Sequence, residues 1–285
     1  MKCNNYGYTV LVSDMQLFFS KSFKNYIKYG IILPLEEEMY KFFVSENQIE
    51  SENITILGED VKHISNVLRL NNLDKVIVCN KENSSSYLTE IINISKDSVV
   101  CRIIDKELET TESGINIDLY QGMPKADKME YIIQKTTEIG VNNIYPVELE
   151  RCIVKLDEKS KYKKIERWQK ISEAAAKQSK RDIIPKIQNV VNIENICQNI
   201  KKYDIILLAY ENEEKNSLKK ELQKLEKNKK LNIGVIVGPE GGLSENEVQK
   251  LVTSGAKCVT LGKRILRTET APIVMLSDII YEFEL

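Results

Sequence analysis

The chain has 285 residues, of which 42% are hydrophobic and 29% are charged, and 41 Lys and Arg against 42 Asp and Glu give a formal net charge of -1. This composition is typical of a protein with an ordinary core, and the length suits one large domain or two, of which we expect two. The balanced charge excludes a uniformly basic nucleic-acid binder, so any such partner must meet a local patch. No apolar run approaches the length of a membrane span, and we expect no membrane contact.

The cysteines and the single histidine limit the chemistry further. Six cysteines are scattered without a C-x-x-C pair, and His63 is the only histidine. This pattern is typical of a reduced cytosolic chain, so we expect a cytoplasmic protein. It also offers no spacing suited to a metal site and makes a Ser-His-Asp triad improbable, so we expect no bound metal.

The first 38 residues differ from the rest of the chain. They lack the order of basic, apolar and small residues of a signal peptide, and Met39 begins "MYKFFVSENQI", which has the pattern of an opening strand. The Glu run at 36–38 would be encoded by purine-rich codons, as expected of a ribosome-binding site just upstream of a start codon at Met39. We therefore predict that residues 1–38 are an N-terminal arm and that translation starts at Met39; the alternative is a translated, peripheral arm.

Residues 39–108 have the pattern of a small β-barrel domain. Five short apolar or alternating runs predict strands at 40–45, 53–57, 75–80, 86–95 and 98–105. One helix is predicted at 58–70, where "GEDVKHISNVLRL" has apolar residues at helical spacing. Several strands and one helix in so short a stretch favour a barrel. The polar residues 108–116 then form a linker.

Residues 117–285 alternate strands and helices, which predicts a larger α/β domain. Aliphatic runs such as "DIILLAY" and "IGVIVG" are typical of a parallel sheet covered on both faces. Helices are predicted across 125–141, about 160–180, 217–228, 244–255 and 270–283. The fold class is therefore α/β, with a small β-barrel before a parallel-sheet domain.

A glycine-rich turn ends one of these strands, in "GVIVGPEGGLSENEV" at 234–248. In open α/β sheets, ligands bind beyond the carboxyl ends of the strands, and Gly238, Gly241 and Gly242 let a backbone approach a flat ligand closely. Ser244 and Glu247 have the spacing of a capping box, which argues against a phosphate on the next helix. Alone, the turn is either a ligand site or a plain structural turn.

The second stretch is "LGKRILRTETAP" at 261–272, which again follows a strand and ends with Pro272 in the first turn of a helix. That terminal helix, 270–283, is apolar over most of its circumference. It must bury more than one face, as at a subunit interface or in an unusual chain crossing.

Together, these two stretches resemble the C-terminal signature of the RsmE-type ribosomal RNA uridine N3-methyltransferases of the SPOUT class. The resemblance includes "QGMPKADKMEYIIQKTTEIGV", "PVELERCIVKLD", "AAAKQSKR" and "HISNVLRL", and it runs from about residue 40 to the end. It implies a trefoil-knotted domain that binds S-adenosylmethionine, a rare exception to unknotted topology. It also implies a PUA-like RNA-binding barrel, a homodimer, and methylation of N3 of a uridine in 16S (small-subunit) ribosomal RNA, free or in the assembled subunit.

The resemblance answers why the glycine turn lacks a phosphate-gripping lysine, because S-adenosylmethionine carries no phosphate. Glycine backbone and apolar side chains then hold the adenine. The residues expected at the cofactor site are Ala209, Gly238, Glu240, Gly241, Gly242, Leu261, Gly262, Ile265, Leu266 and Arg267.

Methylation of uracil N3 requires loss of its proton, and three residues are candidates for this chemistry. Arg267 can stabilise the negative charge on a uracil carbonyl oxygen, and Glu240 or Glu269 can accept the proton directly or through water. The alternative is that the two carboxylates only hold loops in place.

The segment from 121 to 190 has five more basic than acidic residues, and two basic stripes lie within it. One comprises Lys163, Arg167, Lys170 and Lys177 on the long helix, and the other Lys125, Lys128 and Lys135. Each is either a solvated face or a set of phosphate contacts. The expected RNA contacts are Lys41, Arg69, Lys125, Lys163, Arg167, Lys170, Gln178 and Arg181.

Three other functions stay open at this point. The chain could methylate a different RNA, or it could be a catalytically silent RNA-binding relative, against which the intact "GPEGG" and "ILRTET" stretches argue. The third is a small-molecule enzyme without RNA, against which the barrel and the basic stripes argue.

Overall fold

The computed structural model describes residues 27–28, 31–32, 39–106, 108–154, 156–227 and 229–284. The chain divides into two compact units, Met1–Met39 and Tyr40–Leu285. In the first unit, strands β1 (Ile27–Lys28) and β2 (Ile31–Ile32) pair in antiparallel fashion. The rest of the predicted arm, 1–38, and with it the expected start at Met39, lies outside the described residues.

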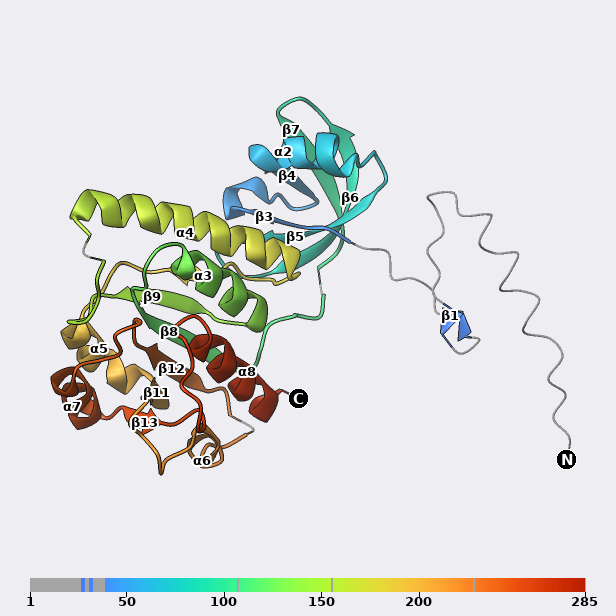
Figure 1. Ribbon diagram of the computed structural model, residues 1–285. Helices are drawn as coiled ribbons and strands as arrows, with labels where there is room; N and C mark the ends of the chain where they lie inside the picture. The colour runs from blue at the N-terminus through green and yellow to red at the C-terminus, as the bar shows by residue number, and fades with distance from the viewer. Residues whose placement is uncertain are drawn as a thin grey trace, which may run out of the picture. The chain divides into compact units, whose positions relative to one another are not determined.

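The smaller sheet contains all five strands predicted for residues 39–108. They are β3 (Lys41–Val44), β4 (Asn53–Leu57), β5 (Lys75–Asn80), β6 (Ser86–Ile94) and β7 (Ser98–Asp105), in the order β3-β5-β6-β7-β4, with the 3-10 helix η2 (Glu46–Gln48) after β3. Only the β3–β5 pair is parallel. The described ladders leave β3 and β4 as unpaired edges, so the sheet is a half-barrel rather than a closed barrel (Figure 1).

The helix of this part is less regular than predicted. Helix α2 (Glu59–Lys62) continues directly as the π-helical turn η3 (His63–Leu68). At the end of η3, the amide of Leu70 donates a hydrogen bond to the carbonyl of Ile64. The turn closes on Arg69 in the left-handed conformation, with φ 55°. Val61 and Ile64 are buried against the sheet, whereas Arg69 is exposed.

The larger sheet is fully parallel, as predicted for residues 117–285. Its strands are β8 (Asn116–Gly122), β9 (Asn143–Val147), β10 (Lys186–Ile187), β11 (Ile205–Ala209), β12 (Asn232–Val237) and β13 (Lys257–Val259), in the order β10-β9-β8-β12-β11-β13. Strands β11 and β12 have the longest aliphatic runs, because helices cover the sheet on both faces.

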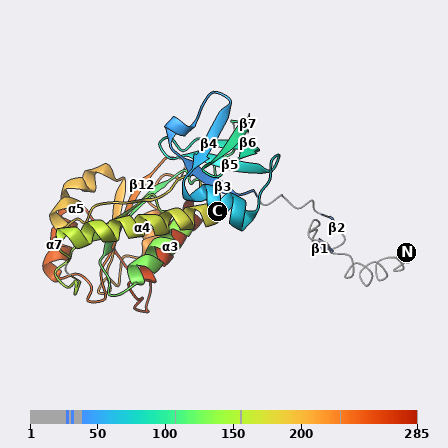
Figure 2. The ribbon, with the colours of Figure 1, turned by 90° about the horizontal axis from the view of Figure 1, so that it is seen from above.

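The helices form a layer on each face of this sheet (Figures 1 and 2). One layer comprises α3 (Lys128–Ile139), α4 (Glu158–Gln178), α6 (Leu218–Leu222) and α8 (Ala271–Phe283), and the other comprises α5 (Ile193–Asn199), the 3-10 turn η4 (Ile200–Lys202) and α7 (Glu245–Ser254). Alternation along β8 explains the division: Ile117 and Leu119 contact the first layer and Tyr120 contacts the second.

After the edge strand β13, the chain returns across the carboxyl ends of β11 and β12 to reach α8, which packs against α3 (Figure 1). Two hydrogen bonds secure this return. The hydroxyl of Thr268 donates to the carbonyl of Gly238 at 2.7 Å, and the buried amide nitrogen of Gln121 donates to that hydroxyl at 3.0 Å. These bonds connect the returning segment to both β12 and β8. The trefoil knot that the resemblance implies would be formed by this segment, and it stays a prediction.

A buried polar junction connects the half-barrel strands to the parallel-sheet region. Asp182, 2% exposed, accepts hydrogen bonds from Lys41 of β3 at 2.5 Å, Ser86 of β6 at 2.8 Å and the amide of Thr111 at 2.7 Å. Next to it, Arg181 pairs with Glu112 and donates to the carbonyl of Val141 at 2.6 Å, so Arg181 secures the end of α3.

Lys41 and Arg181 were expected to contact RNA, and the structure corrects both expectations. Their side chains are 5% and 6% exposed, and each is neutralised by a carboxylate, the buried Asp182 for Lys41 and the half-buried Glu112 for Arg181. A buried, paired cation has already exchanged its water for protein partners, so it is not available to a phosphate. Both residues instead hold the junction together.

We expect the Asp182 junction to lose stability in acid. Burial alone would raise the pKa of Asp182, but hydrogen bonds from Lys41, Thr111 and Ser86 outweigh burial and lower the pKa from 3.8 to about 2. A lowered carboxyl pKa contributes stability above pH 4 that disappears as the pH falls towards 2, here about 2 kcal/mol.

The measurement is urea unfolding of the wild type and Asp182→Asn between pH 5 and pH 2. The difference in unfolding free energy between the two proteins should shrink by about 2 kcal/mol over that range. Asp97→Asn, at an exposed turn, is the control and should keep a constant difference. A constant difference for Asp182→Asn as well would contradict the role of its ionised carboxylate.

Candidate active site

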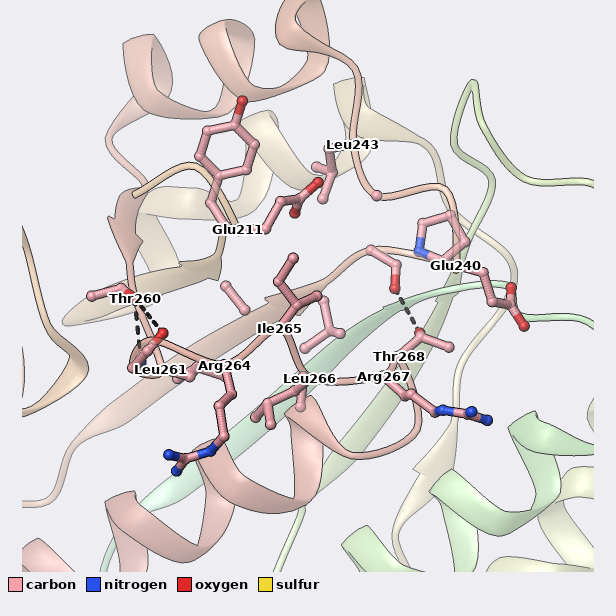
Figure 3. Close-up of a pocket in the computed structure, with 18 of the residues that line it drawn as sticks. Glu211, Glu240, Leu243, Thr260, Leu261, Arg264, Ile265, Leu266, Arg267 and Thr268 are labelled. Atoms are coloured by element: carbon pink, nitrogen blue, oxygen red, sulfur yellow. Dashed lines mark hydrogen bonds between the residues drawn. The ribbon is translucent and has the colours of Figure 1, made fainter. Parts of the chain in front are cut away.

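A cavity of about 520 Å³ lies at the carboxyl ends of β11, β12 and β13. Three loops form it, one after each of these strands, and two of the three are the glycine-rich stretches singled out in the sequence (Figure 3). Its lining residues are Lys128, Ala209, Tyr210, Glu211, Val237, Gly238, Pro239, Glu240, Gly242, Leu243, Thr260, Leu261, Gly262, Lys263, Arg264, Ile265, Leu266, Arg267, Thr268 and Ala271.

The glycine turn after β12 is shaped by local chemistry. The predicted capping box is confirmed: the Ser244 hydroxyl accepts from the Glu247 amide at 3.3 Å, and the Glu247 carboxylate accepts from the Ser244 amide at 2.8 Å. Glu247 also accepts from the amide of Glu150 at 2.8 Å, which fixes the neighbouring loop. Two of the amides at the start of α7, those of Ser244 and Glu247, are therefore already engaged, which argues against a phosphate site there.

Gly242 shows why this turn requires glycine. Its φ is 67°, a conformation that favours glycine, and a Cβ placed there would lie 2.6 Å from Glu211 Oε1. Glu211 projects from the loop after β11, so the missing side chain lets two cavity loops approach each other (Figure 3).

We expect Gly242→Ala to weaken cofactor binding about tenfold, because the added methyl group displaces Glu211 and strains a left-handed residue at a cost of roughly 1–2 kcal/mol. Isothermal calorimetry with S-adenosylmethionine measures this. Gly114→Ala is the matched control, since Gly114 has no atom within 4 Å of the added Cβ and no positive φ. Equal affinities for the two variants would contradict the assignment.

Nine of the ten residues expected at the cofactor site line the cavity, namely Ala209, Gly238, Glu240, Gly242, Leu261, Gly262, Ile265, Leu266 and Arg267. The exception is Gly241, which is outside the lining. It packs against Arg151, whose guanidinium donates to the Gly241 carbonyl at 3.1 Å. Gly241 therefore contributes to the turn on the side away from the cavity, and its carbonyl already accepts a hydrogen bond.

The three candidate catalytic residues belong to one row of alternating charges at an edge of the cavity. Glu240 Oε1 lies 3.0 Å from Lys128 Nζ, which lies 3.1 Å from Glu269 Oε2. Glu269 Oε1 in turn lies 3.9 Å from the Arg267 guanidinium. Arg267, Lys128 and Glu240 line the cavity, whereas Glu269 is outside the lining.

The electrostatics of this row keep all four groups charged. Burial alone would raise the pKa of Glu240 and of Glu269, but hydrogen bonds from their own backbone amides and from Lys128 lower both. Hydrogen bonds to the same two carboxylates raise the pKa of Lys128. At neutral pH the row therefore carries two positive and two negative charges.

Sequence reasoning missed several residues of the site. Lys128 was assigned to a basic stripe, and Glu211, Tyr210, Arg264 and Thr268 were not singled out. Glu211 stands two residues after "IILLA", at the carboxyl end of a parallel strand, and this position is a signal that could have identified it. Lys128 carried no such signal, because its partners are more than 100 residues away.

The other predicted RNA contacts are distributed over two exposed regions. Lys163, Lys170 and Gln178 are exposed on α4, and Arg167 is exposed although it pairs with Glu130 at 2.8 Å. Arg69 is exposed at the end of η3. The remaining members of the two stripes are Lys125, with an exposed side chain, Lys135, which pairs with Glu138, and Lys177, which pairs with Asp60 and Glu173.

Two negative findings apply only to the part of the chain that the structure describes. It contains no group of three or more His, Cys, Asp or Glu side chains suited to a metal ion. None of its helices has both the length and the apolar character needed to cross a membrane.

Comparison with known proteins first defines the class. Residues 111–280 match the RNA methyltransferase domain family, and residues 56–104 match the RNA methyltransferase PUA domain. The fold is therefore that of an RNA methyltransferase with an N-terminal PUA domain, which confirms the fold class expected from the sequence.

The relatives then define the family. The chain is 39% identical to ribosomal RNA small subunit methyltransferase E of Bacillus subtilis (strain 168), over 87% of this chain and 98% of that protein. It is 33% identical to the protein of the same name from Mesomycoplasma hyopneumoniae (strain 232), over 85% of this chain and 99% of that one. The chain belongs to the ribosomal RNA small subunit methyltransferase E family, as the resemblance implied.

A solved structure of a relative agrees with this assignment. The crystal structure of a ribosomal RNA small subunit methyltransferase E from Neisseria gonorrhoeae, bound to S-adenosyl methionine, has a TM-score of 0.74 and 28% identity. The match covers 85% of this chain and 97% of that chain.

Proposed function

We propose that this protein transfers a methyl group from S-adenosylmethionine to N3 of a specific uridine in the RNA of the small ribosomal subunit. The observation that carries the proposal is the single cavity formed by the three loops after β11, β12 and β13, with Arg267 and Glu240 at its edge. Family membership adds the cofactor and the class of RNA, which the names of the relatives state for those proteins.

The cavity fits S-adenosylmethionine in size and chemistry. Its volume is within the usual range for small-molecule sites, and the apolar side chains of Leu243, Leu261 and Leu266 suit a planar adenine. Glu211 is a carboxylate at the cavity and suits the ribose hydroxyls or the ammonium group of the cofactor. Ile265 is 86% exposed on the loop over the cavity, where a ligand would cover it.

The cofactor supplies a methyl group activated by a sulfonium. The uridine N3 proton must leave so that the N3 lone pair can attack that carbon in line. The new nitrogen–carbon bond would form as the carbon–sulfur bond breaks, with the electron pair of the broken bond going to sulfur. Arg267 stabilises the negative charge that the uracil oxygens acquire. Of the two candidate carboxylates, Glu240 lines the cavity, so Glu240 is the one that accepts the proton, directly or through water.

The remaining parts of the proposal concern the RNA, the domains and the assembly. We assign RNA binding to the PUA domain, residues 39–108, and to the exposed cations of α4, and catalysis to residues 117–285. The substrate places the protein in the cytoplasm.

We also propose a homodimer through α8, in which Ile273 and Val274 are only half-buried and Tyr281 is 70% exposed. These side chains give α8 apolar surface beyond its contact with α3.

The test uses labelled S-adenosylmethionine with small ribosomal subunits that lack the modification, followed by nucleoside mass spectrometry of the RNA. Label in 3-methyluridine is the expected result. Label in another nucleoside or another RNA would favour a relative with a different substrate. Cofactor binding without transfer to any RNA would favour a silent RNA-binding protein, and transfer to a small molecule would overturn the proposal.

A further inference from the structure

Lys128 has no role in the function as proposed so far, yet its side chain contacts both candidate carboxylates. Its ammonium lies 3.0 Å from Glu240 and 3.1 Å from Glu269, and it lines the cavity from the first turn of α3. The three residues come from three separate segments: α3, the glycine turn after β12, and the return that precedes α8.

Glu240 is held from a second side. Its carboxylate oxygens accept from the backbone amide of Lys125 at 3.1 and 3.3 Å. The loop that leads into α3 is therefore held to the glycine turn at two points, the Lys125 amide and the Lys128 ammonium. One N–H shared between both oxygens of an ionised carboxylate is a bifurcated, charge-assisted hydrogen bond, and it helps to fix the orientation of the carboxylate.

Glu269 is the counterpart for Arg267. Its second oxygen faces the Arg267 guanidinium at 3.9 Å, and the Arg267 side chain is 80% exposed. Without Lys128, the carboxylates of Glu240 and Glu269 would face each other across an uncompensated gap, and like charges so close would both be disfavoured.

We infer that Lys128 is a positioning residue of the methyl transfer. Lys128 joins Glu240 to Glu269, and Glu269 contacts Arg267, so Lys128 fixes the distance between the Glu240 carboxylate and the Arg267 guanidinium. The inference rests on the proposed function, since it assigns Lys128 to the same reaction. Lys128 itself stays protonated between two carboxylates, so it is not the base.

The charged groups around Glu240 determine its pH response. They are Lys128 from α3, Glu269 and Arg267 from the return segment, and Arg151, which binds the adjacent Gly241 carbonyl. Removal of Lys128 takes a neighbouring positive charge away from both Glu240 and Glu269. The pKa of each carboxyl group should therefore rise from its lowered value, and repulsion between the two carboxylates should raise it further. The acidic limb of the pH profile should then move to higher pH.

The experiment compares Lys128→Met with Lys161→Met. Lys161 is the matched control, because it also bridges two carboxylates, Glu148 at 3.2 Å and Glu158 at 3.0 Å, but is not at the cavity. For Lys128→Met we expect kcat to fall about tenfold at pH 7.5 and further at pH 6, with a smaller change in KM for the cofactor. Lys128→Arg should restore part of the loss. Lys161→Met should keep the wild-type profile.

A second readout needs no activity. Hydrogen exchange of the Lys125 amide in the cofactor-free protein should become faster in Lys128→Met but not in Lys161→Met, because the Glu240 contact is loosened. A wild-type pH profile and wild-type Lys125 exchange in Lys128→Met would overturn the inference. Because the wild type and Lys161→Met are assayed alongside, absence of methyl transfer in those two proteins would instead signal failure of the proposed function.

Discussion

Arg267→Ala should lose methyl transfer by about 100- to 1,000-fold, as measured by kcat/KM on small ribosomal subunits, while the protein stays folded. The magnitude follows from removal of one preorganised donor to a developing oxyanion. The fold should persist because the Arg267 side chain is 80% exposed and its ion pair with Glu269 is 3.9 Å long. Its guanidinium projects from the return loop on the same side as Glu240 (Figure 3).

Arg102→Ala provides the matched comparison. Arg102 is also an exposed arginine with a single glutamate partner, Glu90 at 2.6 Å, but it lies on β7 of the half-barrel sheet. We expect both variants to unfold at the wild-type temperature within about 2 °C, since exposed ion pairs contribute little. Turnover of Arg267→Ala within threefold of the wild type would remove Arg267 from the mechanism.

Local patterns in the sequence predicted the elements that local chemistry determines. The Ser244 and Glu247 capping box depends on two residues three apart, and the aliphatic runs of β11 and β12 depend on burial of both sheet faces. The two glycine-rich cavity loops were predictable as well, since parallel strands present their carboxyl ends together. The terminal helix also begins with Pro272 in its first turn, as expected.

Elements without a strong local pattern were not predicted. The helix expected at 217–228 is only α6, Leu218–Leu222, because the Lys- and Glu-rich residues after Leu222 provide few apolar contacts to anchor further turns. The two-residue strand β10 and the short helix α5 have no periodicity long enough to detect. The π-helical turn η3 has the same apolar spacing as an ordinary helix, so sequence cannot separate the two.

Charged residues were the weakest point of the sequence reasoning, because the sequence shows a charge but not its partner. Lys41 and Asp182 are 141 residues apart, and their contact buries a lysine that the sequence placed on an RNA-binding surface. Lys128 is separated by more than 100 residues from both Glu240 and Glu269, so its role at the cavity emerged only from the folded chain.

The exposed cations of α4 should dominate binding of the RNA. Lys163 and Lys170 are exposed, lie seven residues apart on one helix face, and pair with no carboxylate in the described part of the chain. We expect the double variant Lys163→Glu/Lys170→Glu to weaken affinity for small-subunit RNA on the order of 100-fold at ~0.1 M salt, because two phosphate contacts become repulsive. The slope of log affinity against log salt should become shallower by about 2.

Lys201→Glu/Lys202→Glu is the control of equal charge, at two exposed lysines of η4. Fluorescence anisotropy with a labelled RNA fragment, together with calorimetry of the cofactor, separates the outcomes. The α4 variant should lose RNA affinity and keep cofactor affinity, since neither lysine lines the cavity. An equal loss in both variants would mean that net charge alone attracts the RNA, and an unchanged salt slope in the α4 variant would exclude α4 from the phosphate contacts.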